Sequence, residues 1–428
     1  MSKKAKITDL LNFLDNSPTA WHAVANCTSS LLEHGFKELK EQDAWHIEPS
    51  GKYFVTRNGS SLCAFIVPNK QPSAAHVIAS HTDSPSFKLK PNCEFKKENM
   101  VMLACEVYGS PLLSSWLNRD LGIAGRVIYL DSKNMICEEL IRLEETPVII
   151  PQLAIHLDRN VNENGLVLNK QEHLAALVSV GNNSKLQGTF LERSLKKHIS
   201  KNLLSYDLFL YPLEKARLVG EDHNLISSYR IDNLESVYAS LEALLQTKHS
   251  NDNLLKFMVS WDHEEVGSNS SQGAGSPFLP HIMERIAISL KMSREDYFRL
   301  ISHSLCTSVD QAHALHPNYP EKHDPRHQPL LNQGIVIKTN AQQRYASDAR
   351  SFATIAALCI KHKIPFQKFV SRNDIPCGST VGPITANVTG MPTIDIGCAQ
   401  LSMHSSRELM GVNDHLTMIH FLSEFINT

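Results

Sequence analysis

The sequence predicts an α/β protein with a three-layer α/β/α domain, in which helices cover both faces of a mainly parallel sheet, and an inserted β-rich domain. Two patterns predict this class. Towards both ends of the chain, short apolar runs that end in polar loops alternate with segments of helical periodicity, which is typical of a parallel sheet covered by helices. Between residues 87 and 227, short strand-like stretches dominate instead. A chain of 428 residues is long enough for two or three domains.

The first elements are helices followed by a strand. Residues 7–35 are predicted to be helical because apolar side chains recur on one face, at Ile7, Leu10, Leu11 and Leu14. The run Ser17-Pro-Thr19 interrupts this pattern and restarts it, with the proline near the start of a second helix. Residues 74–80 form an apolar run that ends at His81-Thr-Asp-Ser-Pro85. This run predicts a buried strand that leads into a polar loop.

The middle of the chain has a different pattern of apolar and polar residues. Strand-like stretches occur at residues 101–108, 125–130 and 165–168, and polar loops such as residues 160–164 separate them. A basic, serine-containing stretch covers residues 185–201. We therefore expect residues 87–227 to form a separate domain, inserted into one built from residues 1–86 and 228–428.

Strands and helices alternate again after residue 230. Residues 233–246 carry leucine and valine at helical spacing, and residues 280–289 are a second helix candidate. The predicted strands are residues 254–261, 305–309, 334–337 and 392–396. Asp262, Asp310 and Lys338 directly follow the first three of these strands, and the fourth leads into a loop with His404. The loops beyond the strands are therefore expected to hold the functional groups.

Composition excludes several classes of partner. With 42 Lys plus Arg against 44 Asp plus Glu, the net charge of -2 provides no basic field for nucleic acid. No apolar run approaches the roughly 18 residues of a membrane span, and the N-terminus lacks a secretion signal. Nine scattered cysteines without a Cys-x-x-Cys pair predict buried, reduced thiols. We expect a cytoplasmic protein with no nucleic-acid or membrane partner.

Acidic residues and histidines gather just beyond the predicted strands. They are His81, Asp83, Asp232, Glu264, Glu265, Asp310 and His404. Imidazoles and carboxylates together suit divalent zinc, and also manganese or cobalt. Two such ions about 3.5 to 4 Å apart can hold a hydroxide between them and polarise a carbonyl. The pattern therefore predicts metal-assisted hydrolysis.

The pair Glu264-Glu265 is the most informative local feature. It follows the apolar run of residues 257–261 and precedes Gly267. In an extended backbone, adjacent side chains point to opposite sides, so one carboxylate can bind metal while the other takes a proton from water. His81 and Asp83 form a similar pair, in which the aspartate can orient the imidazole or its loop.

Two other metal-site patterns are not favoured. The second histidine of a zincin helix is absent, because Gly267 stands in its place. Four further histidines lie at irregular spacing in a proline-rich loop, and this placement favours surface or substrate contact over a metal tract. They are His313, His316, His323 and His327.

The sequence also closely resembles the aspartyl aminopeptidase family of dinuclear metallo-aminopeptidases. Matching runs occur in family order across nearly the whole chain. They are Ser17-Pro-Thr19, His81-Thr-Asp-Ser-Pro85, Arg119-Asp-Leu121 with Ala124-Gly-Arg-Val127, Arg230-Ile-Asp-Asn-Leu234, Glu264-Glu-Val-Gly-Ser268, Asp310-Gln-Ala-His313 with His316-Pro-Asn-Tyr319, Arg344-Tyr-Ala-Ser347, Cys377-Gly-Ser-Thr380 and Met403-His-Ser405. Chance agreement of all these runs is negligible.

The resemblance implies a role for each of these positions. His81 and Asp310 would bind one metal, Glu265 and His404 the other, and Asp232 would bridge them. Glu264 would be the general base, and Asp83 is assigned with it to the catalytic residues. His313, Lys338 and Tyr345 match substrate-binding positions, and His156 matches a histidine that reaches into a partner subunit's active site. The family assembles dimers into a dodecamer, so the inserted domain is expected to dimerise and to gate substrate entry.

We therefore expect an aminopeptidase that removes the N-terminal residue of peptides, with a preference for Asp or Glu. That preference depends on Lys338, which could pair with an acidic side chain but could equally lie on the surface or bind the peptide backbone. Two alternatives remain at this point. One is a dinuclear amidase or deacylase of small N-acyl substrates, and the other is a non-catalytic scaffold of the same fold.

Overall fold

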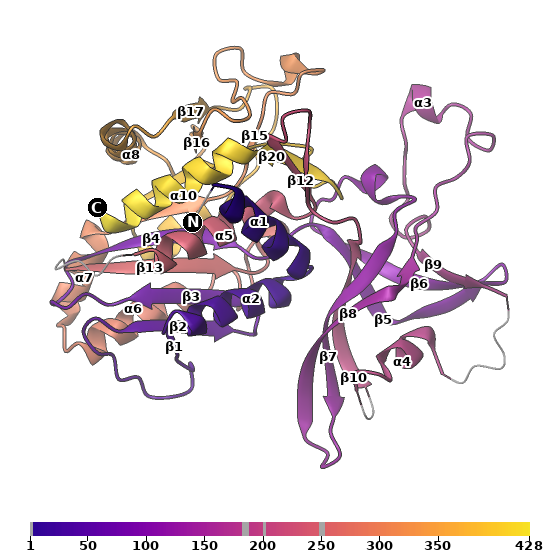
Figure 1. The fold of residues 1–428 in the computed structure, drawn as a ribbon, viewed down its shortest axis with the longest axis horizontal. Helices are drawn as coiled ribbons and strands as arrows, with labels where there is room; N and C mark the ends of the chain where they lie inside the picture. Colours follow the sequence, from indigo (N-terminus) through magenta and orange to yellow (C-terminus); the bar gives the residue numbers. More distant parts are fainter. Residues whose placement is uncertain (1–2, 182–187, 200–202, 248–252) are drawn as a thin grey trace. The chain divides into compact units, whose positions relative to one another are not determined.

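The computed structural model describes residues 3–181, 188–199, 203–247 and 253–428. Two compact units account for the chain (Figure 1). The first comprises Met1–Asp83, Ala216–Met403 and Glu408–Thr428, and the second comprises Ser84–Lys215 and His404–Arg407. These limits differ from the expected insertion of residues 87–227. Strands β11 (Arg217–Val219) and β12 (Leu225–Ser228) belong to the first unit because β12 pairs with β20 (Glu408–Gly411).

A mixed sheet forms the centre of the first unit. Its strands lie in the order β1 (Lys37–Glu38), β2 (Lys52–Arg57), β3 (Ser61–Ile66), β13 (Leu254–Trp261), β4 (Ala74–His81), β14 (Leu305–Val309), β18 (Thr393–Gly397), β16 (Ile335–Lys338) and β17 (Phe366–Phe369). The neighbours β13, β4, β14 and β18 are mutually parallel. Strand β3 is antiparallel to β13, and β16 is antiparallel to β18. The carboxyl ends of the four parallel strands therefore meet at one edge.

Helices cover both faces of this sheet (Figure 1). One core contains residues of α1 (Lys3–Asn16), α2 (Ala20–Glu33), α5 (Ile231–Leu245), α8 (Ala349–His362) and α10 (Val412–Asn427). The other contains residues of α6 (Phe278–Ser289), α7 (Arg294–His303) and α9 (Val381–Thr389). Along β4, Ile78 lies in the first core while Val77 and Ala79 lie in the second. This alternation confirms the predicted α/β/α layers, because successive side chains of a strand point to opposite faces of the sheet and each face is covered by helices.

A smaller sheet in the first unit extends from the loops beyond the central strands. Its order is β11, β12, β20, β19 (Ala399–Leu401) and β15 (Ala312–His313). Strand β15 runs parallel to β19, with His313 in register with Gln400. These two short strands follow β14 and β18 in the chain, so the small sheet carries residues directly beyond the carboxyl edge of the central sheet.

The second unit is built around an antiparallel sheet, as its β-rich sequence predicts. The order is β8 (Ile136–Val148), β7 (Leu121–Leu130), β10 (Leu203–Pro212), β5 (Ser86–Lys97), β6 (Met100–Tyr108) and β9 (Ala176–Val180). Short helices are η1 (Leu113–Trp116), α3 (Val161–Asn164) and α4 (Phe190–Leu195). The strand expected at residues 165–168 is wrong. Val167 is 85% exposed there, and no described strand pairs with this stretch.

The remaining sequence predictions concern single residues and short runs. The nine cysteines are unpaired in the structure, and all but Cys137 and Cys377 are buried, as expected for most of them. Of the basic stretch at residues 185–201, only residues 188–199 are described, and they contain α4. Among the described helices, none combines the length and the apolar character that crossing a bilayer requires.

Candidate active site

The predicted site residues of the first unit gather where the parallel strands end. His81 is the last residue of β4 and pairs in register with Trp261, the last residue of β13. Glu264 and Glu265 come shortly after β13, and Asp310 follows β14. Asp232 lies at the start of α5 and is 3% exposed. Parallel pairing thus brings together residues that are far apart in the chain.

His81 is the centre of this cluster. Its Nε2 lies 3.4 Å from Oδ1 of Asp232 and 3.7 Å from Oδ1 of Asp310. One ligand atom each from His81, Asp232 and Glu265 lie within 4.8 Å of one another. His81, Asp232 and Asp310 are buried and Glu265 is half-buried. The structure therefore brings together four of the five predicted metal ligands.

Asp83 contacts both His81 and the Glu264-Glu265 turn. One carboxylate oxygen accepts a hydrogen bond from the backbone N–H of Glu264, and the other accepts from that of Glu265, each at 3.1 Å. Its Oδ1 also lies 3.4 Å from Nδ1 of His81. Asp83 thereby orients the imidazole on one side and the Glu264-Glu265 turn on the other.

The backbone at Glu264 and Glu265 differs from the expected extended form. These residues form a short 3₁₀ turn, η2 (Glu264–Val266), between His263 and Gly267, both with positive φ. Adjacent side chains on a 3₁₀ turn diverge by about 120°, so the two carboxylates still point in different directions. A tight turn, and not an extended backbone, therefore separates the two carboxylates, and Asp83 fixes this turn through both backbone N–H groups.

A family model described as "Aminopeptidase I zinc metalloprotease (M18)" matches residues 13–426. The chain belongs to the M18 aminopeptidase family. It is therefore a metallo-aminopeptidase, which decides between the alternatives left open by the sequence in favour of a peptidase. The resemblance drawn from the short runs is confirmed at the level of this family.

Curated relatives agree with this membership over the whole chain. A "Probable M18 family aminopeptidase 2" of Clostridium novyi is 42% identical over 436 residues, covering 100% of both chains. A protein of the same description in Streptomyces coelicolor is 40% identical over 425 residues, covering 98% of this chain and 96% of the relative.

Solved structures show the same fold. The structure titled "Cryo-EM structure of the Ape4 and Nbr1 complex" matches with a TM-score of 0.94 at 35% identity, covering 99% of this chain and 86% of that one. "Structure of S. cerevesiae mApe1 dodecamer" matches with a TM-score of 0.86 at 28% identity, covering 99% and 96%. Both values confirm the α/β fold with a β-rich second unit.

The ligand set of this M18 aminopeptidase fits a divalent cation. Three buried or half-buried carboxylates and one imidazole converge from separate elements, and such oxygen and nitrogen donors are those zinc accepts. Without a cation, several negative charges would face one another in a desolvated space. A bound cation balances that charge, so the donor chemistry itself favours metal at this place.

Electrostatics at His81 reflect the same crowding of carboxylates. Burial alone would lower the pKa of His81, but its contacts with Asp232, Asp310 and Asp83 raise that pKa well above its ordinary value. The neighbouring carboxylates thus favour the protonated imidazole, whereas burial opposes it. Metal binding would displace that proton, because a ligating histidine must be neutral at the coordinating nitrogen.

Glu264 differs from an ordinary exposed glutamate. Burial raises its pKa well above the ordinary value; the His81 charge opposes this shift, and Glu265, Asp310 and Asp83 add to it. A carboxylate with a raised pKa is a stronger base than an ordinary glutamate. This environment therefore suits Glu264 to proton transfer.

Several buried residues that hold the predicted ligands in place were not predicted from the sequence. Glu408 accepts a hydrogen bond from the backbone N–H of Asp232 at 3.0 Å. Asn233 donates to the carbonyl oxygen of Val309 at 2.8 Å, and Arg230 donates to that of Thr82. The sequence signal that could have found them is proximity to the predicted ligands. Arg230 and Asn233 lie in the same run as Asp232, and Glu408 follows shortly after His404.

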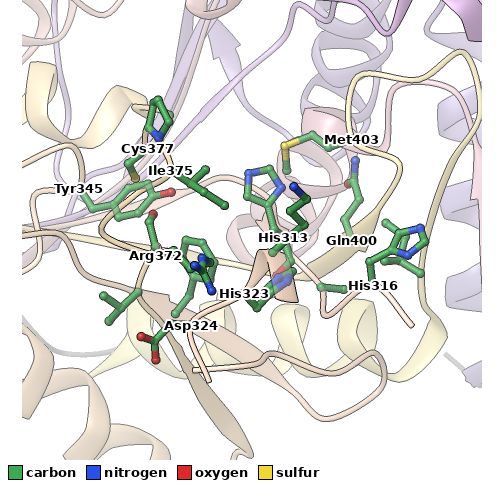
Figure 2. A pocket seen from close by; sticks show the side chains of 18 of the residues that line it. His313, His316, His323, Asp324, Tyr345, Arg372, Ile375, Cys377, Gln400 and Met403 are labelled. Atoms are coloured by element: carbon green, nitrogen blue, oxygen red, sulfur yellow. The ribbon is translucent and has the colours of Figure 1, made fainter. Parts of the chain in front are cut away.

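A pocket of about 330 Å³ is lined by residues that begin at His313, three positions after the predicted ligand Asp310 (Figure 2). His313 and Tyr345, both predicted to contact substrate, line it together with His316 and His323. Apolar walls come from residues such as Phe369, Ile375 and Met403. The three histidines were predicted to be surface or substrate groups and not a metal tract, and their place in this lining is compatible with substrate contact.

Lys338 lies elsewhere than its predicted role requires. It is 1% exposed, and its Nζ donates to the carbonyl oxygens of Asp310 and Gln311 at 2.9 and 3.0 Å. The ammonium lies 5.0 Å from the ring centre of Tyr345 and does not line the pocket. Its visible contacts hold the Asp310 backbone, so direct pairing with an acidic substrate has no support in this geometry.

The last predicted residues lie in the second unit. His404 is half-buried, and its Nδ1 lies 3.1 Å from the carbonyl oxygen of Ser110. His156 is exposed, and the neighbouring Leu153, Ile155 and Leu157 are 59%, 45% and 74% exposed. The roles of His404 as a ligand and of His156 as a group for a partner subunit are taken up below as proposals.

Proposed function

We propose that this M18 aminopeptidase removes the N-terminal residue of peptides with two divalent cations, zinc by preference, and Glu264 as general base. His81 and Asp310 would hold one cation, Glu265 and His404 the other, and Asp232 both. The observation that supports this most is the convergence of His81, Asp232 and Glu265, whose ligand atoms lie within 4.8 Å of one another.

The chain's own residues have distinct tasks in this proposal. Bound cations would polarise the scissile carbonyl and lower the pKa of a water molecule. Glu264 takes the proton from the attacking water and returns it to the amine that leaves when the C–N bond breaks. The Asp83 carboxylate accepts a hydrogen bond from the backbone N–H of Glu264 at 3.1 Å. This bond fixes the turn, so the Glu264 carboxylate stays apart from that of its ligating neighbour Glu265.

The preference for an acidic N-terminal residue is also a proposal. What supports it is the lining of the pocket, because imidazoles donate hydrogen bonds to carboxylates whether or not they are protonated. His313, His316 and His323 supply imidazoles and Lys322 supplies a cation. Asp324 is the acidic residue of the lining, and it is paired with His327 at 2.8 Å.

A panel of aminoacyl p-nitroanilides, assayed before and after chelation and zinc reloading, tests this function.

The same panel decides the role of Lys338. For Lys338→Met we expect kcat/KM to fall by up to about a hundredfold on every substrate, because a displaced Asp310 misplaces the reacting groups. The ratio of acidic to neutral substrates should stay unchanged. The free energy of unfolding should fall by about 1–3 kcal/mol, since two buried carbonyls lose their donor.

Lys368→Met is the matched control, because this lysine lies on the neighbouring strand β17 and its Nζ lies over the Phe352 ring. It should leave activity unchanged. If Lys338→Met instead lost only the acidic preference, Lys338 would contact the substrate side chain and the positioning role would be wrong.

We further propose a homo-oligomer, a dodecamer built from dimers, in which the second unit dimerises and gates substrate entry and His156 serves a partner subunit's site. A related structure is described as a dodecamer. The exposed leucine and isoleucine side chains around His156 also favour burial in an assembly. Free cysteines throughout support a cytoplasmic location.

Light scattering after size exclusion, combined with metal analysis, tests the assembly. We expect a mass near twelve chains and two zinc ions per chain. A monomer with full activity would contradict the role of His156 in a partner's site. A single ion per chain would contradict the dinuclear centre while leaving the peptidase intact.

A further inference from the structure

Gln400 has an unusual side chain for a buried residue. It lies in the middle of β19, is 1% exposed and contributes to the lining of the pocket (Figure 2). Among the residues that the structure describes, neither its amide oxygen nor its amide nitrogen has a hydrogen-bond partner. A buried amide normally has a hydrogen-bond partner. Because this amide has none within the described protein, it can bind a ligand in the pocket.

The backbone of Gln400 is held on both sides. In the small sheet it lies in register with His313 of β15 and with Met410 of β20. Its carbonyl oxygen accepts a hydrogen bond from the N–H of Ala314 at 2.8 Å. A group fixed on a paired strand is presented to a ligand with little freedom to move away.

A second buried atom in the same lining has the same property. His323 is 9% exposed, and its Nδ1 has no hydrogen-bond partner within the described part of the chain. Its other ring nitrogen lies 3.4 Å from the carbonyl oxygen of His313. Two unsatisfied buried polar groups in the lining of one pocket indicate a polar ligand, because burying such groups unpaired is unfavourable.

Some of the residues that line the pocket lie close in sequence to the proposed metal ligand Asp310. His313 on β15 is three residues from Asp310. The carbonyl oxygen of Asp310 is held by Lys338 at 2.9 Å and not by Gln400. Gln400 can therefore bind substrate without being needed to keep the metal ligands in place. This separation makes its contribution measurable.

We propose that Gln400 is a specificity-determining residue of the aminopeptidase, whose amide binds a carbonyl or carboxyl oxygen of the peptide. The proposal depends on the function proposed above. The oxygen can come from the side chain of the N-terminal residue, as in Asp, Glu, Asn or Gln, or from a peptide bond beyond the scissile one. An amide both donates and accepts, so a carboxamide or a peptide bond would engage it fully, whereas a carboxylate engages only its N–H.

The test uses Gln400→Leu, which removes both polar atoms, and Gln400→Asn, which withdraws the amide by one methylene. Substrates are the p-nitroanilides of Asp, Glu, Gln and Leu and the tripeptides Leu-Ala-Ala and Glu-Ala-Ala. We expect kcat/KM to fall about tenfold to a hundredfold on the substrates that supply the oxygen, with Leu p-nitroanilide unchanged. A loss on the Asp, Glu and Gln anilides and on Glu-Ala-Ala, with Leu-Ala-Ala unchanged, identifies the side chain. A loss on both tripeptides, with every anilide unchanged, identifies the main chain.

Gln367→Leu is the matched control, because its amide pairs with the backbone of Leu330 and lies outside the pocket lining. It should lower the melting temperature without changing substrate preference. Equal kinetics of both Gln400 variants and the wild type on every substrate would overturn the proposal, and so would an equal loss on all substrates including Leu p-nitroanilide. Failure of the proposed function is a different result, namely no hydrolysis by the zinc-loaded wild type.

Discussion

Glu264→Gln should lower kcat by about 10²- to 10⁴-fold while the protein stays folded and keeps its metal. The glutamine has nearly the same size, and its backbone N–H can still donate to Asp83, as that of Glu264 does at 3.1 Å. It cannot take a proton from water, so the transfer to the leaving amine is lost. Steady-state kinetics on the p-nitroanilide of the preferred residue, metal analysis and thermal melting measure the three parts of this result.

Glu265→Gln is the matched control, because it makes the same change at the adjacent residue of η2. It should lose metal as well as activity, since an amide is a weaker ligand than a carboxylate for zinc. Wild-type turnover in Glu264→Gln would rule out its role as the base. Loss of metal in Glu264→Gln together with full metal in Glu265→Gln would mean that the two roles are exchanged.

His81→Ala should lose most of the bound metal and at least about a hundredfold in activity. Removing a residue that only orients a ligand already costs about 10- to 100-fold in metal affinity, and His81 is proposed as the ligand itself. Its Nε2 lies 3.4 Å from Asp232 and 3.7 Å from Asp310, so its loss also leaves buried carboxylates without their partner. Metal content per chain and kcat/KM, measured at saturating and limiting zinc, test this.

His76→Ala provides the control on the same strand. His76 stacks on the ring of Phe425 at 4.7 Å, and its Nδ1 lies 2.7 Å from the Phe425 carbonyl oxygen. Its loss should lower the melting temperature but leave metal content unchanged. If His81→Ala kept two ions per chain, the convergence of side chains at the end of β4 would have another explanation.

The central elements could be predicted from the sequence because burial on both faces leaves a strong pattern. The strands at residues 254–261 and 305–309 begin and end with the apolar runs. The weaker signal at residues 165–168 failed, because a short apolar run does not show whether a partner strand is available to it. The limits of the second unit were missed for the same reason, since β12 pairs with β20 across a long stretch of sequence.

The site was predictable only in part. Acidic residues and histidines after apolar runs pointed to His81, Glu265 and Asp310, and also to Asp83. The same pattern did not point to Arg230, Asn233 and Glu408, which make the other supporting hydrogen bonds. Lys338 matched a substrate-binding position by resemblance, yet its ammonium is buried against the backbone carbonyl oxygens of residues 310 and 311. Gln400 gave no signal, because a single glutamine in a short run does not show whether its amide is paired.

The sequence by itself determined the fold class, the family and the kinds of residue available for catalysis, since periodicity and local runs are properties of neighbouring residues. Only the tertiary structure decided which groups meet. It brings His81, Asp232 and Glu265 together, turns Lys338 inward and leaves the amide of Gln400 in the lining of a pocket. The physical reason is that strand pairing and burial act between residues distant in the chain, and they set which polar groups are satisfied within the protein and which remain for a ligand.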